Sequence, residues 1–341
     1  MIDLADLLLD ALAIPSLTGS EATYGAFLET QLNTIFGPHL VTLERQPVEA
    51  DRFNLLACCG SDNPDILFST HIDTVPPFLE PRISANKIFG RGACDTKGLQ
   101  VSMLHAGQQL LEQGIHSFGF LFVVGEEVDH CGARVASQQL SLHPSGILLG
   151  EPTRNRIMRA QKGVLRVRIS TRGVSGHSGY PESGKSATHQ LLDFLQNLRH
   201  LELPSHPNRG TTTLNIGTLT GGEAANVIAP SASADIMIRT VSPTQVLLDM
   251  FSPLLSSDIT LEVVHQSDPL DLHVLPGFET DVAHFFTDAG FLQALGPVTL
   301  LGPGDIRFAH SEREQITREE LYEGSKLYQR AARTLLEKTN S

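Results

Sequence analysis

The stretch ILFSTHIDTVPP, residues 66–77, decides the fold and supplies the first candidate site residues. Its apolar start predicts a buried strand, because a short apolar run that ends in turn residues is typical of one. His71 and Asp73 follow at the point where this strand should end. In α/β folds, ligands bind at the carboxyl ends of the strands, so the stretch predicts a binding or catalytic site there.

Three further apolar runs are followed by acids or a histidine: FGFLFVVG (118–125) by Glu126 and Glu127, SGILLG (145–150) by Glu151, and VTLLGPGD (298–305) by a loop that reaches His310. After the first strand, the glycine-punctuated loop GRGACDTKG (90–98) contains Asp95 and precedes a predicted helix at 99–114. The alternation of strands and helices predicts an α/β fold with a mostly parallel sheet covered on both faces.

The pattern changes near residue 162, where a second unit begins. Its segments follow the order β-α-β-β-α-β, which is typical of a ferredoxin-like α+β unit, at residues 164–171, 186–201, 211–219, 232–240, 243–255 and 258–265. If His310 belongs with His71, this unit is an insertion into the first domain. The predicted boundaries are therefore residues 1–161 and 267–341 for a discontinuous catalytic domain, and 162–266 for the inserted domain.

Helices are predicted at both ends of the chain. Residues 3–13 are dominated by Leu and Ala and predict the first helix. A second helix should follow Thr18, which is spaced to form a capping box with Glu21. The last helix should be capped by Thr317 and Glu320 and run to about residue 338.

Length and composition bound the class of protein. A chain of 341 residues suggests two domains, and 41 % hydrophobic with 18 % charged residues is the composition of a globular protein. The net charge of −13 and the pI of about 5.5 disfavour a nucleic-acid or membrane partner. The first residues carry acids where a signal peptide would be basic, and the four cysteines form no CxxC pair. We therefore expect a reduced, cytoplasmic setting.

The residues at the strand ends have the chemistry of a metal centre. Burying the pair Glu126-Glu127 after an apolar run is expensive unless a cation compensates the two charges. Nitrogen and oxygen ligands suited to zinc or a similar divalent ion come from five positions, His71, Asp95, Glu127, Glu151 and His310. Five ligands exceed one tetrahedral site and suit two metals that share a bridging carboxylate. Asp73 would then take the other N–H of His71, which leaves Glu126 free to act as the general base.

Six segments taken together resemble the successive motifs of one family: STHIDTVP, GRGACDTKG, GEE, LLGEPT, KGVLRVRISTRGVSGHSGYPESGKSA and LGPGDIRFAHSERE. They look like those of the acetylornithine deacetylase / succinyl-diaminopimelate desuccinylase family of di-zinc metallohydrolases, which also contains carboxypeptidases, dipeptidases and aminoacylases. The resemblance covers about residues 66–314. It implies a zinc-exopeptidase-like catalytic domain in which His71 and Glu151 hold one zinc, Glu127 and His310 hold the other, and Asp95 bridges them.

The resemblance also assigns roles in the inserted domain, which looks like the family's lid and dimerisation domain. His177 matches a histidine that reaches the partner's active site in a homodimer and stabilises the oxyanion. Arg239, Asn226 and Gly304 match positions that hold the substrate carboxylate. The sequence departs from the family's motifs at two places. Gly125 stands where relatives often carry Asp, and Ser-Glu-Arg-Glu follows His310. These departures bear on the subfamily and remove none of the proposed ligands.

The function predicted from this resemblance is hydrolysis of the amide bond of an N-acyl amino acid, with N-acetylornithine or N-acetylcitrulline as the first choice, in amino-acid (arginine) biosynthesis. The alternatives within the family are release of lysine or ornithine from a carrier protein, succinyl-diaminopimelate desuccinylation and dipeptide cleavage. The cofactor should be two divalent ions, zinc first, with cobalt or manganese open. A catalytically inactive binding or scaffolding protein is the alternative from another class.

One competing motif points to nucleotide chemistry. GYPESGKS (179–186) matches the phosphate-binding pattern G-x-x-x-x-G-K-[ST] and precedes a helix. The predicted strand ends near Thr171, too far upstream to launch such a loop. Pro181 removes a backbone donor, and Glu182 adds negative charge where phosphates would bind. We therefore interpret the segment as the lid loop that follows His177.

Nucleophilic catalysis is weakly supported by the sequence. No G-x-S-x-G motif occurs, and Ser175 and Ser178 lack flanking glycines in register. Cys94, beside Asp95, is expected to be a buried neutral thiol.

Overall fold

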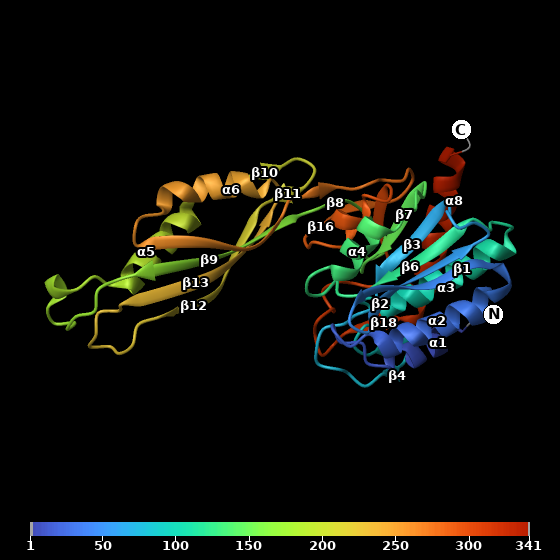
Figure 1. Ribbon diagram of the computed structural model, residues 1–341, viewed down its shortest axis with the longest axis horizontal. Helices are drawn as coiled ribbons and strands as arrows, with labels where there is room; N and C mark the ends of the chain where they lie inside the picture. Colours follow the sequence, from blue (N-terminus) through green and yellow to red (C-terminus); the bar gives the residue numbers. More distant parts are fainter. Residues whose placement is uncertain (1–2, 340–341) are drawn as a thin grey trace. The chain divides into compact units, whose positions relative to one another are not determined.

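The computed structural model describes residues 3–339, which fold into two compact units (Figure 1). The first unit comprises Met1–Arg159, Leu272–Asp281 and Thr287–Ser341. The second comprises Ala160–Asp271 and Val282–Phe286.

The first unit is built on a mixed sheet whose strands follow the order β1-β2-β6-β3-β7-β17 and continue to β8. Strands β6, β3, β7 and β17 are parallel to one another. The pairs β1–β2, β2–β6 and β17–β8 are antiparallel. The strands are β1 (Leu40–Glu49), β2 (Arg52–Cys59), β3 (Ile66–His71), β6 (Phe118–Val123), β7 (Gly146–Gly150), β8 (Ile157–Gln161) and β17 (Val298–Leu301). The prediction of a mostly parallel main sheet is confirmed.

The register of this sheet brings the predicted site residues to one edge. His71, the last residue of β3, lies opposite Val123, the last residue of β6. Gly150 at the end of β7 lies opposite Leu301 at the end of β17. The four parallel strands therefore end at the same edge, and the side chains that follow them can converge there.

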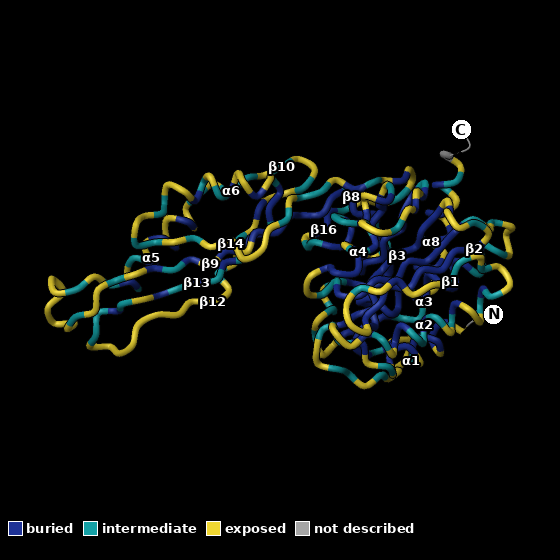
Figure 2. The backbone as a smooth tube through the Cα atoms, viewed as in Figure 1, coloured by how far each residue is buried: buried dark blue, intermediate teal, exposed yellow. Residues whose placement is uncertain are grey.

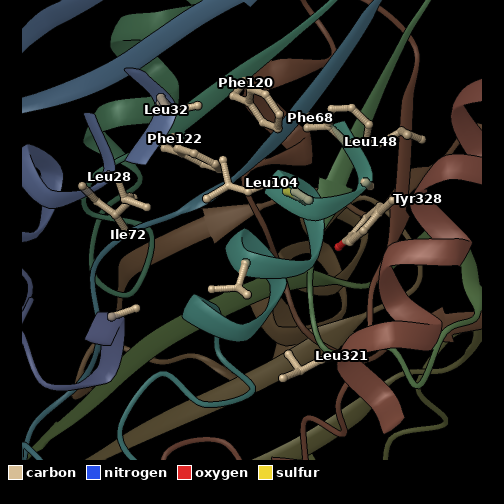
Figure 3. Close-up of a cluster of buried hydrophobic side chains, with 14 of the residues drawn as sticks. Leu28, Leu32, Phe68, Ile72, Leu104, Phe120, Phe122, Leu148, Leu321 and Tyr328 are labelled. Atoms are coloured by element: carbon tan, nitrogen blue, oxygen red, sulfur yellow. The ribbon is translucent and has the colours of Figure 1, made fainter. Parts of the chain in front are cut away.

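Helices α1 (Leu4–Leu12), α2 (Ala22–Phe36), α3 (Lys97–Glu112) and α8 (Arg318–Thr339) pack with one another, and α4 (Cys131–Gln139) packs with α7 (Ala289–Leu292). Figure 2 shows the inner strands β2 and β3 of this unit as buried. Alternate residues of β6 place Phe118, Phe120 and Phe122 on the same face. The ring of Phe68 stacks on Phe120 with 5.5 Å between centroids and meets Tyr328 of α8 edge-on at 6.0 Å (Figure 3). This aromatic core fixes the strands whose ends carry the site.

The ends of the chain confirm two predicted helices and correct one predicted cap. Residues Leu4–Leu12 form the first helix, and Thr317 and Glu320 exchange the hydrogen bonds of a capping box at α8. The predicted box between Thr18 and Glu21 is wrong. The helix begins only at Ala22, because the Thr18 hydroxyl donates to Asp73 and the Glu21 carboxylate binds Arg52 instead.

The second unit is an antiparallel four-stranded sheet in the order β12-β13-β9-β14, with two helices. Taken as strands one to four along the chain, these strands have the order 4-1-3-2 of a ferredoxin-like unit. Its elements are β9 (Gly163–Arg172), α5 (Ala187–His200), β12 (Thr213–Gly221), β13 (Ser231–Thr240), α6 (Thr244–Phe251) and β14 (Ile259–Ser267). Alternate residues of β13 are buried against a core that includes Leu191, Phe194 and Leu198 of α5.

The remaining strands are short: β4 (Arg82–Ser84), β5 (Lys87–Phe89), β10 (Ser205–His206), β11 (Gly210–Thr211), β15 (Leu270–Asp271), β16 (Thr280–Ala283) and β18 (Gln315–Thr317). None of the helices formed by residues 3–339 combines the length and the apolar character needed to span a membrane.

Candidate metal centre

The centre begins with His71, which is buried at the end of β3. Its Nδ1 donates to the backbone carbonyl of Asp73 at 3.0 Å, and this bond directs the ring so that Nε2 lies 3.1 Å from Oδ1 of Asp95. A neutral imidazole that donates through Nδ1 presents a lone pair at Nε2. Two lone pairs face each other across this short distance, which is an arrangement that calls for a proton or a cation between the two atoms.

Asp95 lies between two histidines. Its Oδ1 lies 3.1 Å from Nε2 of His71, and its Oδ2 lies 3.2 Å from Nε2 of His310. His310 also lies 3.0 Å from Oε2 of Glu127. His71, Asp95 and Glu127 each place a ligand atom within 4.8 Å of the others. One carboxylate with a different histidine at each oxygen is the donor arrangement that a bridge between two cations requires.

Asp73 organises the loop that carries the two glutamates. Its carboxylate accepts hydrogen bonds from the backbone N–H groups of Glu126 at 3.1 Å and Glu127 at 3.2 Å, and from the Thr18 hydroxyl at 2.8 Å. Its Oδ1 also lies 3.4 Å from Nδ1 of His71. Burial opposes its charge, but the contacts with His71 and these donors lower the pKa of Asp73. Asp73 thus ties the His71 strand to the glutamate loop.

The carboxylates repel one another in a buried place. Burial, together with the charge of Glu151, raises the pKa of Glu126 well above its ordinary value. Burial and the charge of Asp95 raise the pKa of Glu127, and burial raises that of Glu151 well above its ordinary value despite the opposing effect of His71. Across residues 3–339, the ion pairs of these acids are with histidines, not with Lys or Arg.

The pKa values of the two histidines are raised as well, which for an imidazole favours the charged form. Burial opposes the charged form of His71, yet its bonds to Asp73 and Asp95 raise the pKa of His71 well above the ordinary value. The bonds from Asp95 and Glu127 raise the pKa of His310 to about 10. Both rings attract positive charge, and within residues 3–339 the ion pairs of the acids involve no Lys or Arg. The donor set of imidazole nitrogens and carboxylate oxygens therefore fits divalent metal ions.

Two residues that the sequence did not single out, Glu314 and Arg91, support the Asp95 loop. Glu314 accepts from the backbone N–H groups of Gly92 at 2.9 Å and Asp95 at 3.2 Å, and it is hydrogen-bonded by Arg91. Burial raises the pKa of Glu314 to about 7. The only sequence signal for this role was that Glu314 closes the resemblance to the family.

Two glycines near the centre are required by close packing. A Cβ on Gly304 (φ +85°) would lie 2.9 Å from the Cβ of Cys94, and the buried Cys94 precedes Asp95. A Cβ on Gly125 (φ +80°) would lie 2.5 Å from Sγ of Cys131. The departure at Gly125 therefore has a local physical cause. Burial raises the pKa of the Cys94 thiol well above its ordinary value, as expected for a neutral thiol.

The other predicted residues belong to the second unit. Nδ1 of His177 accepts from the backbone N–H of Gly179 at 3.1 Å, which leaves Nε2 as the donor of a neutral ring. Asn226 lies beside this loop, because its carbonyl accepts from the backbone of Ser178. Arg239 lies on β13, opposite Thr213 and Val164. The structure brings His177 and Asn226 together.

The residues of the competing phosphate-loop motif make structural contacts within the second unit. Lys185 pairs with Asp258, and the Ser186 hydroxyl accepts from His189 to cap α5. The strand that precedes it, β9, belongs to an antiparallel sheet rather than to a parallel nucleotide-binding sheet. The P-loop interpretation is therefore not supported.

Comparison with known proteins agrees with this geometry. Residues 159–250 match the family model of the peptidase dimerisation domain. A peptidase M20 domain-containing protein of Schizosaccharomyces pombe is 35 % identical over 327 residues, covering 93 % of this chain and 81 % of the relative. A probable carboxypeptidase of Aspergillus oryzae is 33 % identical over 375 residues, covering 96 % of this chain and 86 % of the relative.

Solved structures share the fold at lower identity. Aminopeptidase PepT of Bacillus cereus superposes with a TM-score of 0.79 at 19 % identity, covering 98 % of both chains. Bacillus subtilis YxeP, named as a dinuclear metal-binding peptidase of the M20 family, gives a TM-score of 0.71 at 13 % identity, covering 98 % of this chain and 97 % of that one.

Fold, site and relatives together define a metal-dependent amide hydrolase. More particularly, the chain belongs to the M20 peptidase family. Its named relatives are peptidases and carboxypeptidases rather than acetylornithine deacetylases.

Proposed function

We propose that this chain is a di-metal exopeptidase-type hydrolase, which cleaves the amide bond next to a free substrate carboxylate. The observation that carries the proposal is the position of Asp95, whose two carboxylate oxygens each lie against a different histidine. Two cations that share one carboxylate would use both of its oxygens in this way.

Five residues would hold the ions: His71 and Glu151 one of them, Glu127 and His310 the other, with Asp95 shared. Zinc suits these nitrogen and oxygen donors best, and cobalt or manganese can occupy the same set. When bound, such ions polarise the substrate carbonyl and lower the pKa of water.

Glu126 is the general base in this proposal. It belongs to the glutamate loop, and the raised pKa of its carboxyl suits a group that takes a proton and returns it. Glu126 removes the proton of the attacking water and passes it to the departing amine. Asp73 holds the backbone of Glu126 in place while this happens.

The second unit would complete the site from a partner subunit. The match to a peptidase dimerisation domain supports a homodimer. His177 would then donate from Nε2 to the oxyanion that forms on the substrate. Arg239, Asn226 and Gly304 would hold the substrate carboxylate.

Short peptides with a free carboxyl terminus are the first substrate class, because the curated relatives that match nearly the whole chain carry carboxypeptidase names. N-Acyl amino acids are the second class, since the six motifs resemble the acetylornithine deacetylase branch. Acetylornithine, acetylcitrulline, succinyl-diaminopimelate and carrier-linked lysine or ornithine belong to this class. A cytoplasmic role in amino-acid metabolism would follow from it.

The test is amine release from a panel of dipeptides, tripeptides, N-acetyl-ornithine, -citrulline, -lysine and succinyl-diaminopimelate. Each is measured with added zinc, cobalt or manganese, and again with a chelator. Chelator-sensitive turnover of peptides supports the first class, and turnover of acyl amino acids alone supports the second. A panel without turnover, in protein that binds no metal, would instead indicate an inactive scaffold.

A further inference from the structure

A buried histidine–aspartate pair lies beside the proposed base, and the mechanism above does not use it. His130, 9 % exposed, precedes α4, and its Nδ1 donates to Oδ1 of Asp288 at 2.8 Å. The same Nδ1 lies 3.8 Å from Oε1 of Glu126. The ring of Phe291 lies 5.5 Å from the imidazole, centroid to centroid. The edge of a well-held imidazole thus faces the Glu126 carboxylate.

The position of Asp288 is costly for a purely structural pair. Asp288 is 1 % exposed, and its Oδ2 is buried without a hydrogen-bond partner. Its charge adds to the repulsion that raises the pKa values of Glu126 and Glu151, after the larger effect of burial. A histidine can be held by a neutral acceptor elsewhere in a fold without this penalty.

The backbone of His130 also contacts the loop that carries Glu126. Its φ of +57° is a left-handed conformation that non-glycine residues seldom adopt, and it turns the chain directly after the glutamate loop. The backbone N–H of His130 donates to Gly125 at 2.7 Å, which closes the loop that presents the two glutamates. Both the backbone and the side chain of His130 therefore act on the segment that carries the base.

We propose that His130 and Asp288 are positioning residues for Glu126. Asp288 fixes the orientation of the imidazole by accepting from Nδ1, and the fixed ring restricts the Glu126 carboxylate to the conformer that transfers the proton. This inference rests on the proposed role of Glu126 as the general base. A base displaced by about 1 Å can lose up to about 100-fold in rate, so the effect is measurable.

The test uses two substitutions that both tolerate the left-handed backbone, His130→Gly and His130→Asn. Only asparagine keeps a donor near the position of Nδ1. We expect H130G to lower kcat about 10- to 100-fold with KM changed by less than about twofold and the bound metal per chain unchanged. H130N should recover most of the loss. D288A, which removes the acceptor, should resemble H130G and serves if H130G does not fold.

A matched control comes from His105, another buried histidine, whose Nδ1 lies 2.7 Å from the Ser325 hydroxyl and which contacts Tyr322 edge-on. H105Q should leave kcat unchanged. The second readout is the double variant with E126Q. If His130 acts through Glu126, then H130G causes little further loss in the E126Q background.

Three results would overturn the inference while leaving the proposed function in place. H130G and D288A with wild-type kcat exclude a positioning role. Equal losses for H130G and H130N exclude the donor as its basis. An undiminished loss in the E126Q background shows that His130 acts by another route. A wild-type enzyme without turnover across the peptide and acyl amino acid panel refutes the proposed function itself, and this inference with it.

Discussion

Replacing Asp73 by asparagine tests how the centre is held together. The Asp73 side chain is fully buried, and its two oxygens accept hydrogen bonds from the backbone of Glu126, from the backbone of Glu127 and from Thr18. An amide offers one acceptor oxygen and turns the other position into a donor. At least one backbone N–H of the glutamate loop therefore loses its partner and faces an NH2 group.

The expected cost follows from these contacts. A buried donor without a partner costs about 1–3 kcal/mol, and a hydrogen bond to a charged group contributes about 1.5–3 kcal/mol. Together they predict that D73N destabilises the closed glutamate loop by about 2.5–6 kcal/mol. D73N also removes the carboxylate charge that lies 3.4 Å from Nδ1 of His71, so the affinity for metal should fall about 10- to 100-fold.

Hydrogen exchange measured on peptides that span residues 118–130 reports the loop directly. D73N should speed exchange at Glu126 and Glu127, while a metal titration should show the weaker affinity. Circular dichroism follows global unfolding, because the chain has no Trp. D235N is the control, since Asp235 pairs with Arg168 at the surface of the second unit and should change neither reading. Wild-type exchange and metal affinity in D73N would refute the reasoning.

Four further outcomes are expected. E126Q should keep its metal yet lose about 10²–10⁴-fold in kcat, because the general base is absent; a fully active variant contradicts the assignment. Mixing E126Q with H177A chains should restore activity in mixed dimers, since one site then contains both intact residues; no recovery after subunit exchange contradicts a partner-supplied histidine. Chelated protein should unfold more easily as the pH rises above about 4.5. The raised pKa values of Glu126, Glu127 and Glu151 let the folded state hold more protons than the unfolded state, and this stabilisation is lost as the acids ionise. A melting temperature that rises with pH over this range contradicts the prediction. G304A should lower the melting temperature and kcat, since its Cβ would press on Cys94; unchanged values would show that the loop can yield.

Local patterns in the sequence predicted the sheet and the residues at its edge well. A buried parallel strand needs a continuous apolar run, and a catalytic side chain at its end must interrupt that run. His71, Glu126 and Glu151 are visible for this reason. The ferredoxin-like unit was predicted equally well, because its helices and strands show the apolar periodicities of helices and strands.

The predicted capping box at the second helix was wrong, because the same residue spacing is compatible with other hydrogen-bond partners. Thr18 and Glu21 have the spacing of a capping box, but each binds a residue from another segment. An ion pair with Arg52 satisfies Glu21 better than a backbone N–H does, because both groups are charged and shielded from water. The spacing alone could not show which partner would win.

By itself, the sequence determined the order of the strands and helices and the acids and histidines that directly follow the strands. The tertiary structure decided which groups support them: Asp288 beside His130, and Glu314 under the Asp95 loop. These contacts join residues more than 150 positions apart. Periodicity records which face of an element is buried, but partners across such separations are chosen by how the packed elements bring their polar groups within hydrogen-bonding distance.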